Sequence, residues 1–374
     1  MQLLPDQASL YLHIPFCSTI CPFCDFTKLK TNESLYQTYI NACCHELNAY
    51  QNDPTIELTS IFFGGGTPSS LPIRYIKQLI QTIHTTFNCT NIQEITIEMN
   101  PEDVSLNYLS ELKQLGFTRI SLGVQTFHSD ECQFLGRGHT VQQSYHALEL
   151  IKTFSFDLNI DLMFGLPNTS TKHLEYSVQQ ALLYEPNHFS CYSLTIEPDT
   201  LFFKKQIPKA SHDHDFNYYS FLIDYLTEQQ FHHYEVSSFA KTNHECIHNK
   251  RYWAFESYIG IGLGAHSFIS PYRYQNKTSL TDYIKSSVPS LFLPDFQPLS
   301  QTDLMKENII ANLRIPTGIN FNDYQHRYNI NFEDMFHDEI NDLIHQKLIY
   351  KTTFGIQTTK KGLYLLDNVC LSFL

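Results

Sequence analysis

Short runs of β-branched and aromatic residues alternate with longer segments of helical hydrophobic periodicity along the first half of the chain. This alternation predicts βαβ units around a parallel sheet. The predicted strands are Ser9–Ile14, Leu58–Phe63, Glu94–Met99, Arg119–Val124, Leu158–Phe164 and His188–Leu194. The predicted helices between them are Leu35–Tyr50, Ile73–Phe87, Leu106–Leu115, Gln142–Phe154 and Thr171–Leu183. Six predicted strands alternating with helices in series favour a (β/α) barrel, complete or partial, over a doubly wound sheet.

Polar residues or glycines follow the end of each predicted strand. In chain order they are a cysteine cluster, the run Gly64–Pro68, the run Glu98–Pro101, Gln125, the run Asp161–Pro167, and Thr195 with Glu197. Because the carboxyl ends of parallel strands lie at one end of a barrel, we expect these residues to form one polar site there.

The pattern changes beyond Asp199, where a helix over Phe216–Gln229 and a strand over Tyr234–Ser238 are predicted. The segment 243–267 holds the only tryptophan of the chain, and residues 279–301 are rich in Ser, Pro and Gln. Further helices are predicted at Thr302–Leu313, Phe321–Tyr328 and Phe332–Gln346, followed by a hairpin of Leu348–Thr352 and Ile356–Thr359. We therefore expect an α/β barrel over 1–278, a linker over 279–301 and a small winged-helix-like accessory domain over 302–374.

Composition and charge exclude several classes of protein. The 374 residues are 42 % hydrophobic with a mean hydropathy of −0.26, a balance typical of soluble globular proteins. The net charge of −13 argues against nucleic-acid binding through a basic face, so the winged-helix-like domain is interpreted as a packing or lid domain. No targeting segment or bilayer-spanning run is visible, so we expect a cytoplasmic protein without a membrane anchor of its own.

Three of the ten cysteines are spaced as metal ligands: Cys17, Cys21 and Cys24 form a C-x3-C-x2-C pattern. Three thiolates on one loop can hold three irons of a 4Fe-4S cubane and leave the fourth iron open. Zinc with His13 as the fourth ligand is the alternative, but structural zinc sites usually combine two ligand pairs. Since no second pair follows, the spacing favours iron–sulfur, and the other cysteines are interpreted as buried or inert thiols.

Five motifs of the first half occur together in one known family. They are HIPFCSTICPFCDF (13–26), GGGTP (64–68), EMNP (98–101), SLGVQTF (121–127) and DLMFGLP (161–167). As a set they resemble the radical S-adenosylmethionine family, in the branch that contains oxygen-independent coproporphyrinogen III dehydrogenase and the HemW-like heme chaperones. The resemblance implies a partial (β/α) barrel with a 4Fe-4S cluster.

The same resemblance implies that S-adenosylmethionine chelates the open iron and that the reduced cluster can cleave it to a 5′-deoxyadenosyl radical. The residues implied are Gly65, Gly66 and Thr67 at the methionine end, Glu98 at the ribose, and Tyr11 and Phe23 beside the cluster and adenosine. Gln125, Arg137 and Asp161 match positions that hold a second S-adenosylmethionine in the dehydrogenase.

Two positions separate the branches. The dehydrogenase has a further cysteine where this chain has Phe26, as HemW-like proteins do. The run HNKRYW (248–253) matches the H-N-x-x-Y-W motif of HemW-like proteins. The resemblance therefore implies heme contact by His248, with Asn249 beside it and Tyr252 and Trp253 flanking a porphyrin face.

The resulting hypothesis is a heme chaperone that passes heme to an acceptor hemoprotein, such as a respiratory enzyme at the membrane. An electron donor for the cluster is a further expected partner. The cluster could serve radical chemistry or a regulatory or structural role. The alternatives are the dehydrogenase, which decarboxylates the propionates of coproporphyrinogen III, and a zinc-dependent interaction module.

Overall fold

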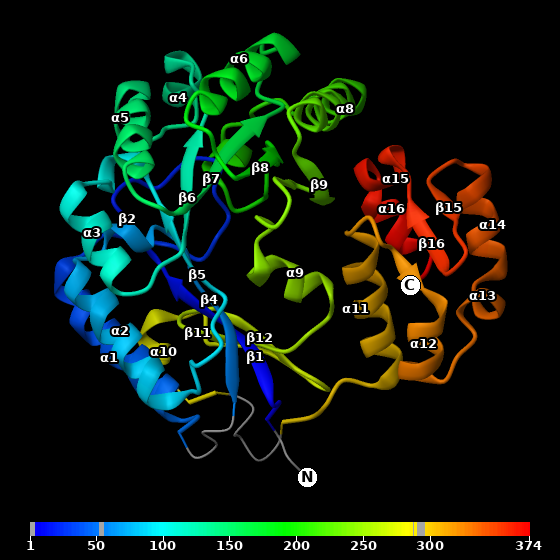
Figure 1. Ribbon diagram of the computed structural model, residues 1–374, viewed down its shortest axis with the longest axis horizontal. Coiled ribbons are helices and arrows are strands. Elements are labelled where there is room, and N and C mark those ends of the chain that lie inside the picture. Colours follow the sequence, from blue (N-terminus) through cyan, green and yellow to red (C-terminus); the bar gives the residue numbers. More distant parts are fainter. Residues whose placement is uncertain (1–3, 52–55, 287, 290–295) are drawn as a thin grey trace.

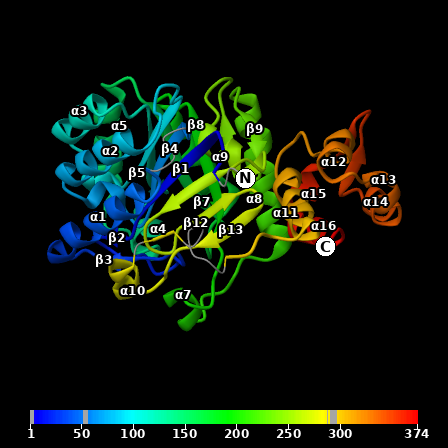
Figure 2. The same cartoon turned by 90° about the horizontal axis from the view of Figure 1, so that it is seen from below.

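The structure, a computed structural model, describes residues 4–51, 56–286, 288–289 and 296–374. A large sheet wrapped by helices lies beside a smaller C-terminal domain, and the two parts remain distinct when the molecule is turned (Figures 1 and 2). No helix of the described residues is both long and apolar enough to cross a bilayer.

Parallel strands form the centre of the large sheet. They are β1 (Gln7–Ile14), β4 (Glu57–Gly65), β5 (Glu94–Met99), β6 (Arg119–Gln125), β7 (Asp157–Phe164) and β8 (His188–Ser193). The register aligns buried Leu10, Ile61 and Ile95 across three neighbouring strands. Each predicted strand of this set lies within two residues of the observed one.

Further strands, most of them antiparallel to their neighbours, extend the sheet at both sides. The strand β11 (Tyr258–Ile261) pairs in parallel with β1, and β12 (His266–Ile269) and β13 (Tyr272–Gln275) follow it. On the other side β10 (Ser238–Ala240) pairs with β8, and β9 (His232–Glu235) with β10. In the described part of the chain β13 and β9 are the two edges, so the predicted (β/α) barrel is partial.

The strand predicted over 234–238 is wrong in detail, because the chain turns there. Glu235 ends β9, and its carboxylate accepts a hydrogen bond from the backbone N–H of Ser237 (3.1 Å). Ser238 then begins β10, which runs antiparallel to β9.

Helices cover the outer face of the parallel strands (Figure 1). They are α1 (Glu33–Asn48), α2 (Ile73–Thr86), α3 (Leu106–Gln114), α4 (Ser129–Phe134), α5 (Val141–Lys152), α6 (Thr171–Leu182) and α8 (His212–Glu228). In α2 the buried Ile76, Ile80 and Ile83 recur at intervals of three and four, so one stripe packs on the sheet. The hydrophobic period predicted these helices except the six-residue α4, because each of the others has one buried stripe of this kind.

Short elements shape the carboxyl ends of the strands. They are β2 (Phe16–Cys17), β3 (Leu29–Lys30), the 3₁₀ turns Pro68–Ser70 and Pro101–Asp103, and α7 (Leu201–Lys204). The strands β2 and β3 pair in parallel and close the base of a loop, residues 17–28, here called the cysteine loop.

The C-terminal domain has a core of its own, built on Leu313, Tyr324, Phe332 and Ile356 among others. Its elements are α11 (Gln301–Leu313), β14 (Ile319–Asn320), α12 (Phe321–Tyr328), α13 (Phe332–Met335), α14 (His337–His345), β15 (Ile349–Lys351), β16 (Gly355–Thr358), α15 (Lys360–Tyr364) and α16 (Leu366–Leu371). The predicted helix over 332–346 is split in two at Phe336, whose backbone leaves the helical region. Helices followed by a β15–β16 hairpin match the expected small domain.

The predicted linker begins with a packed helix. Residues Leu280–Lys285 form α10, and the Tyr283 hydroxyl donates a hydrogen bond to the buried Glu46 of α1 (2.6 Å). Residues 287 and 290–295 of that predicted linker lie outside the described residues.

Candidate functional site

The cysteine loop lies at the carboxyl end of β1. Cys17 ends β2 and is buried, whereas Cys21 and Cys24 lie in the loop and are partly exposed. The Cys24 N–H donates to the Cys21 carbonyl (3.2 Å), and the Lys28 ammonium donates to the Cys24 carbonyl (2.6 Å). Burial raises the pKa of the Cys17 and Cys24 thiols, and the Lys28 charge acts in the opposite direction. The loop thus holds three thiols, and the positive charge of Lys28 favours the thiolate forms of Cys17 and Cys24.

Two further donors point at the thiol sulfurs. Thr67 Oγ1 lies 3.5 Å from Cys17 Sγ, and Arg137 Nη1 lies 3.2 Å from Cys21 Sγ. Hydrogen bonds and cations next to sulfur stabilise thiolates and tune the potential of a cluster that they bind. These donors fit a thiolate-ligated iron–sulfur cluster.

No three His, Cys, Asp or Glu side chains of the described residues converge on a point where they could hold one shared metal ion. A cubane does not require that convergence, because each thiolate binds a different iron atom. The chemistry of the three thiols therefore fits the group that the spacing predicts.

The glycine run at the end of β4 is required by packing within the protein. Gly65 has φ +113°, and a Cβ there would lie 2.5 Å from the His13 ring. A Cβ on Gly66 would lie 2.7 Å from the backbone carbon of Pro15. Glycine at these positions lets β4 pass close to the strand that leads into the cysteine loop.

A hydrogen-bond network joins the ends of three strands. Arg137 Nη2 donates to Asn100 Oδ1 (2.7 Å) and to the Gly123 carbonyl (2.8 Å), and Asn100 Nδ2 donates to Thr67 Oγ1 (3.3 Å). Gln125 has φ +70° at the end of β6, and its amide lies beside Gly123. Sequence reasoning did not assign Asn100, although it is part of the EMNP motif and could have been found there.

A cavity of about 220 Å³, here called the barrel cavity, lies inside the barrel. Tyr11, Glu98 and Asp161 line it, and Glu98 Oε2 accepts the Gly65 N–H (3.0 Å). Burial raises the pKa of Glu98 to about 8, and the negative charge of Asp161 adds to the shift. Burial also raises the pKa of Asp161 to about 6, although hydrogen bonds from Asn159 and other side chains lower it. This cavity holds two carboxyl groups whose charge a cationic ligand would stabilise.

The raised pKa of Glu98 predicts a pH-dependent stability. A carboxyl that ionises near 4.5 when unfolded and near 8 when folded binds its proton more tightly in the folded state. The free energy of unfolding of the cofactor-free protein should therefore fall as pH rises from about 4.5 to about 8. In thermal melts between pH 5 and pH 8.5, the melting temperature of the Glu98→Gln variant should fall less with rising pH than that of the wild type.

The exposed Glu149 of α5 offers a matched control, because Glu149→Gln removes a carboxyl from the surface. That variant should follow the wild-type profile. Equal pH dependence in Glu98→Gln and the wild type would contradict the assignment to Glu98.

Phe23 lies outside the barrel cavity. Its ring centroid is 6.4 Å from that of Phe202 in α7, within a small apolar cluster that includes Leu135 and Leu166. The Pro22 carbonyl accepts the Phe202 N–H (3.0 Å), so α7 is bound to the cysteine loop. Phe23 is thus placed beside the cysteine loop, on the side of α7.

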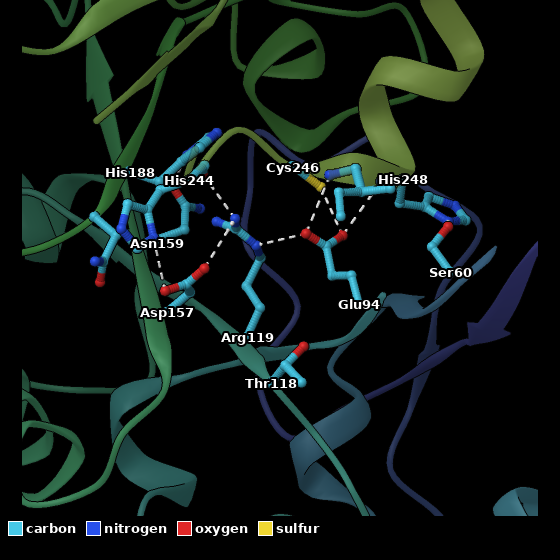
Figure 3. Close-up of polar contacts among 12 residues, drawn as sticks. Ser60, Glu94, Thr118, Arg119, Asp157, Asn159, His188, His244, Cys246 and His248 are labelled. Atoms are coloured by element: carbon cyan, nitrogen blue, oxygen red, sulfur yellow. Dashed lines mark hydrogen bonds and ion pairs between the residues drawn. The ribbon is translucent and has the colours of Figure 1, made fainter. Parts of the chain in front are cut away.

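The HNKRYW run lies at the opposite end of the barrel, in helix α9 (Ile247–Trp253). Glu94, the first residue of β5, accepts the backbone N–H groups of Ile247 (3.1 Å) and His248 (3.2 Å) (Figure 3). Arg119, the first residue of β6, pairs with Glu94 (3.0 Å) and donates to the His244 carbonyl (2.7 Å). The start of α9 is therefore anchored where the strands begin, away from the cysteine loop.

His248 points into the barrel cavity and is 1 % exposed. Its Nδ1 lies 3.0 Å from Ser60 Oγ, and its Nε2 lies 2.8 Å from the Tyr252 hydroxyl. Burial lowers the pKa of His248 to about 3, and the charge of Arg251 adds to the shift. The ring is neutral at physiological pH, and both of its nitrogens are hydrogen-bonded in this conformation.

The aromatic pair of the motif does not form one face. Asn249 and Tyr252 line the barrel cavity with His248. Trp253 instead faces the C-terminal domain, where the Arg314 guanidinium lies 4.6 Å from its ring centre. The expectation that Tyr252 and Trp253 flank the same porphyrin face is not met in this conformation, because consecutive helical residues point in different directions.

Comparisons with known proteins place these features in context. The Radical SAM superfamily profile matches residues 11–181, and the HemN C-terminal domain profile matches residues 299–365. A protein named heme chaperone HemW from Lactococcus lactis is 33 % identical, covering 100 % of this chain and 98 % of that protein. A protein of the same name from Bacillus subtilis is 32 % identical, covering 98 % of this chain and 99 % of that protein.

The fold is also similar to that of a solved structure. Coproporphyrinogen III oxidase (HemN) from Escherichia coli, described as a radical SAM enzyme, superimposes with a TM-score of 0.85. The alignment covers 98 % of this chain and 90 % of that chain at 23 % identity. This likeness shows the partial barrel and its small C-terminal domain.

Proposed function

We infer that this chain, which belongs to the HemW family of radical S-adenosylmethionine proteins, is a heme chaperone that binds heme and passes it to an acceptor hemoprotein. The observation that carries the proposal is the similarity to proteins of that name along the whole chain. Phe26 supports it, because a 65 % exposed phenylalanine stands where the dehydrogenase branch has a cysteine.

In this proposal Cys17, Cys21 and Cys24 ligate a 4Fe-4S cluster, and Thr67 and Arg137 donate hydrogen bonds to two of the thiolates. When bound, the cluster supplies one-electron redox chemistry, and its open iron takes S-adenosylmethionine.

The S-adenosylmethionine contacts that we propose lie next to the cluster. Their residues are Tyr11, Phe23, Gly65, Gly66, Thr67, Glu98, Gln125, Arg137 and Asp161. Glu98 and Asp161 contribute negative charge toward a cationic ligand, and the partly buried Tyr11 lines the same cavity.

For heme we propose contact through α9 and its residues His248, Asn249, Tyr252 and Trp253. Iron coordination by His248 requires that its hydrogen bond to Tyr252 opens, because Nε2 is occupied in this conformation. His248→Ala should then shift the Soret band and weaken hemin binding. An unchanged band and affinity would assign the iron ligand to another residue.

An anaerobic assay tests the function itself. The reconstituted protein is incubated with coproporphyrinogen III, S-adenosylmethionine and a reductant, while hemin binding is titrated in parallel at the Soret band. We expect stoichiometric hemin binding, transfer to an apo-hemoprotein and no protoporphyrinogen. Protoporphyrinogen formed over many turnovers would instead make the protein a dehydrogenase.

A further inference from the structure

A second and larger cavity lies between the barrel and the C-terminal domain and is lined by Arg251 of α9, Leu304 of α11 and Arg327 of α12 among others. Helices α9 and α11 lie side by side there (Figure 1). The volume of this cavity is about 460 Å³, within the roughly 300–1,000 Å³ range of small-molecule sites. The barrel cavity, at about 220 Å³, is below that range. The larger cavity, here called the interdomain cleft, therefore has the volume of a small-molecule site.

Two arginines line the interdomain cleft, one from each side. Arg251 belongs to α9, and Arg327 is an exposed residue of α12. Arg251 Nη1 pairs with Glu256 Oε2 (3.0 Å), but its buried Nε has no hydrogen-bond partner. Guanidinium groups bind carboxylates through paired N–H donors. The cleft thus combines two guanidinium groups with one carboxylate, that of Glu256, which already pairs with Arg251, in a chain whose net charge is −13.

Apolar groups line the same cleft. Phe255 and Tyr328 are buried side chains, and Leu304 of α11 is partly buried and packs against the cluster that contains Phe255. Phe255 packs against Phe268 with ring centres 4.4 Å apart, so its position is held from the barrel side. The cleft has the chemistry of a site for an apolar body that carries carboxylates.

Helix α9 presents different residues to the two cavities. His248 and Tyr252, four residues apart, face the barrel cavity. Arg251 and Phe255, also four residues apart, face the interdomain cleft, with Phe255 just beyond the end of the helix. One short segment therefore borders both cavities. Of the two, the interdomain cleft is the one with an arginine on each wall.

We propose that the interdomain cleft binds the propionate edge of heme, with Arg251 and Arg327 holding the two carboxylates and Phe255 and Leu304 against the macrocycle. The proposal rests on the proposed function and adds the site at which heme is recognised. Among the described residues that line the cleft, none is His, Cys or Met. Recognition there depends on the carboxylates and not on the iron.

Titrations of the full-length protein with hemin, metal-free protoporphyrin IX and hemin dimethyl ester test this site. Removing one charge-assisted contact should weaken hemin and protoporphyrin IX binding about tenfold in each of Arg251→Gln and Arg327→Gln. The dimethyl ester should bind the wild type weakly and should not respond to either substitution. Because Arg327 is exposed, its substitution leaves the fold intact even if Arg251→Gln perturbs α9.

Arg74→Gln is the matched control, since Arg74 is an exposed arginine in the outer helix α2. It should bind hemin as the wild type does. Equal hemin affinity in the wild type and both cleft variants would overturn the cleft assignment while leaving the chaperone function in place. A wild type that binds neither hemin nor protoporphyrin IX would overturn the function and the cleft together.

Discussion

Cys24→Ser is expected to prevent assembly of the 4Fe-4S cluster. A cubane held by only three thiolates has no spare protein ligand, so loss of one thiolate leaves two irons without protein ligation. Iron content after anaerobic reconstitution should fall from about four to less than about one per chain. The charge-transfer absorption of the cluster and its spectroscopic response to S-adenosylmethionine should disappear with it.

Cys89→Ser provides the matched control, because Cys89 is a partly exposed free thiol between α2 and β5 and outside the cysteine loop. That variant should retain wild-type iron and sulfide. A Cys24→Ser protein that still carries a full cluster would show that another residue completes the ligand set. Bound zinc in place of iron in the wild type would restore the zinc alternative.

Arg119→Met is expected to lower the free energy of unfolding by about 3–5 kcal/mol. Arg119 and Glu94 are 3 % and 4 % exposed, so the variant leaves the Glu94 carboxylate buried without its counter-charge. Since Glu94 also accepts N–H groups at the start of α9, the variant should loosen that segment as well. Urea unfolding measures the first effect, and hydrogen exchange of residues 246–253 measures the second.

The exposed pair Lys152–Glu185 is the control, because surface ion pairs contribute little. Lys152→Gln should change the free energy of unfolding by less than about 1 kcal/mol. The double variant Glu94→Gln/Arg119→Met should lose less than the sum of the single variants, since each removes the same contact. A loss below about 1 kcal/mol in Arg119→Met would contradict the anchoring role.

Local periodicity predicted most of the barrel. The central strands β1 and β4 to β8 are short, mostly buried runs, and the helices that the pattern predicted have one buried face each, so both leave a signal within a short window. Strands β11, β12 and β13 were missed because they are short and β11 pairs with β1, hundreds of residues away in the chain. Their pairing is set by long-range contacts that no window contains.

Some parts of the candidate site were also visible in local sequence, whereas others depend on contacts between distant residues. Cys17, Cys21 and Cys24 lie within one short loop, so their spacing alone indicated shared ligation. Arg137 Nη1, in contrast, reaches Cys21 from 116 residues further along the chain. Asn100 connects Thr67 to Arg137 only because the ends of adjacent strands meet.

The sequence by itself indicated the family, the (β/α) barrel, three cysteines spaced as cluster ligands and the small C-terminal domain, because each depends on neighbouring residues or on a repeated pattern. Only the tertiary structure decided where the HNKRYW segment lies. Its anchor joins Glu94 to the His248 N–H across 154 residues, and no local pattern encodes such a contact. The same fold placed Arg251 and Arg327 on opposite walls of one cleft, because two domains that are separate in sequence pack side by side.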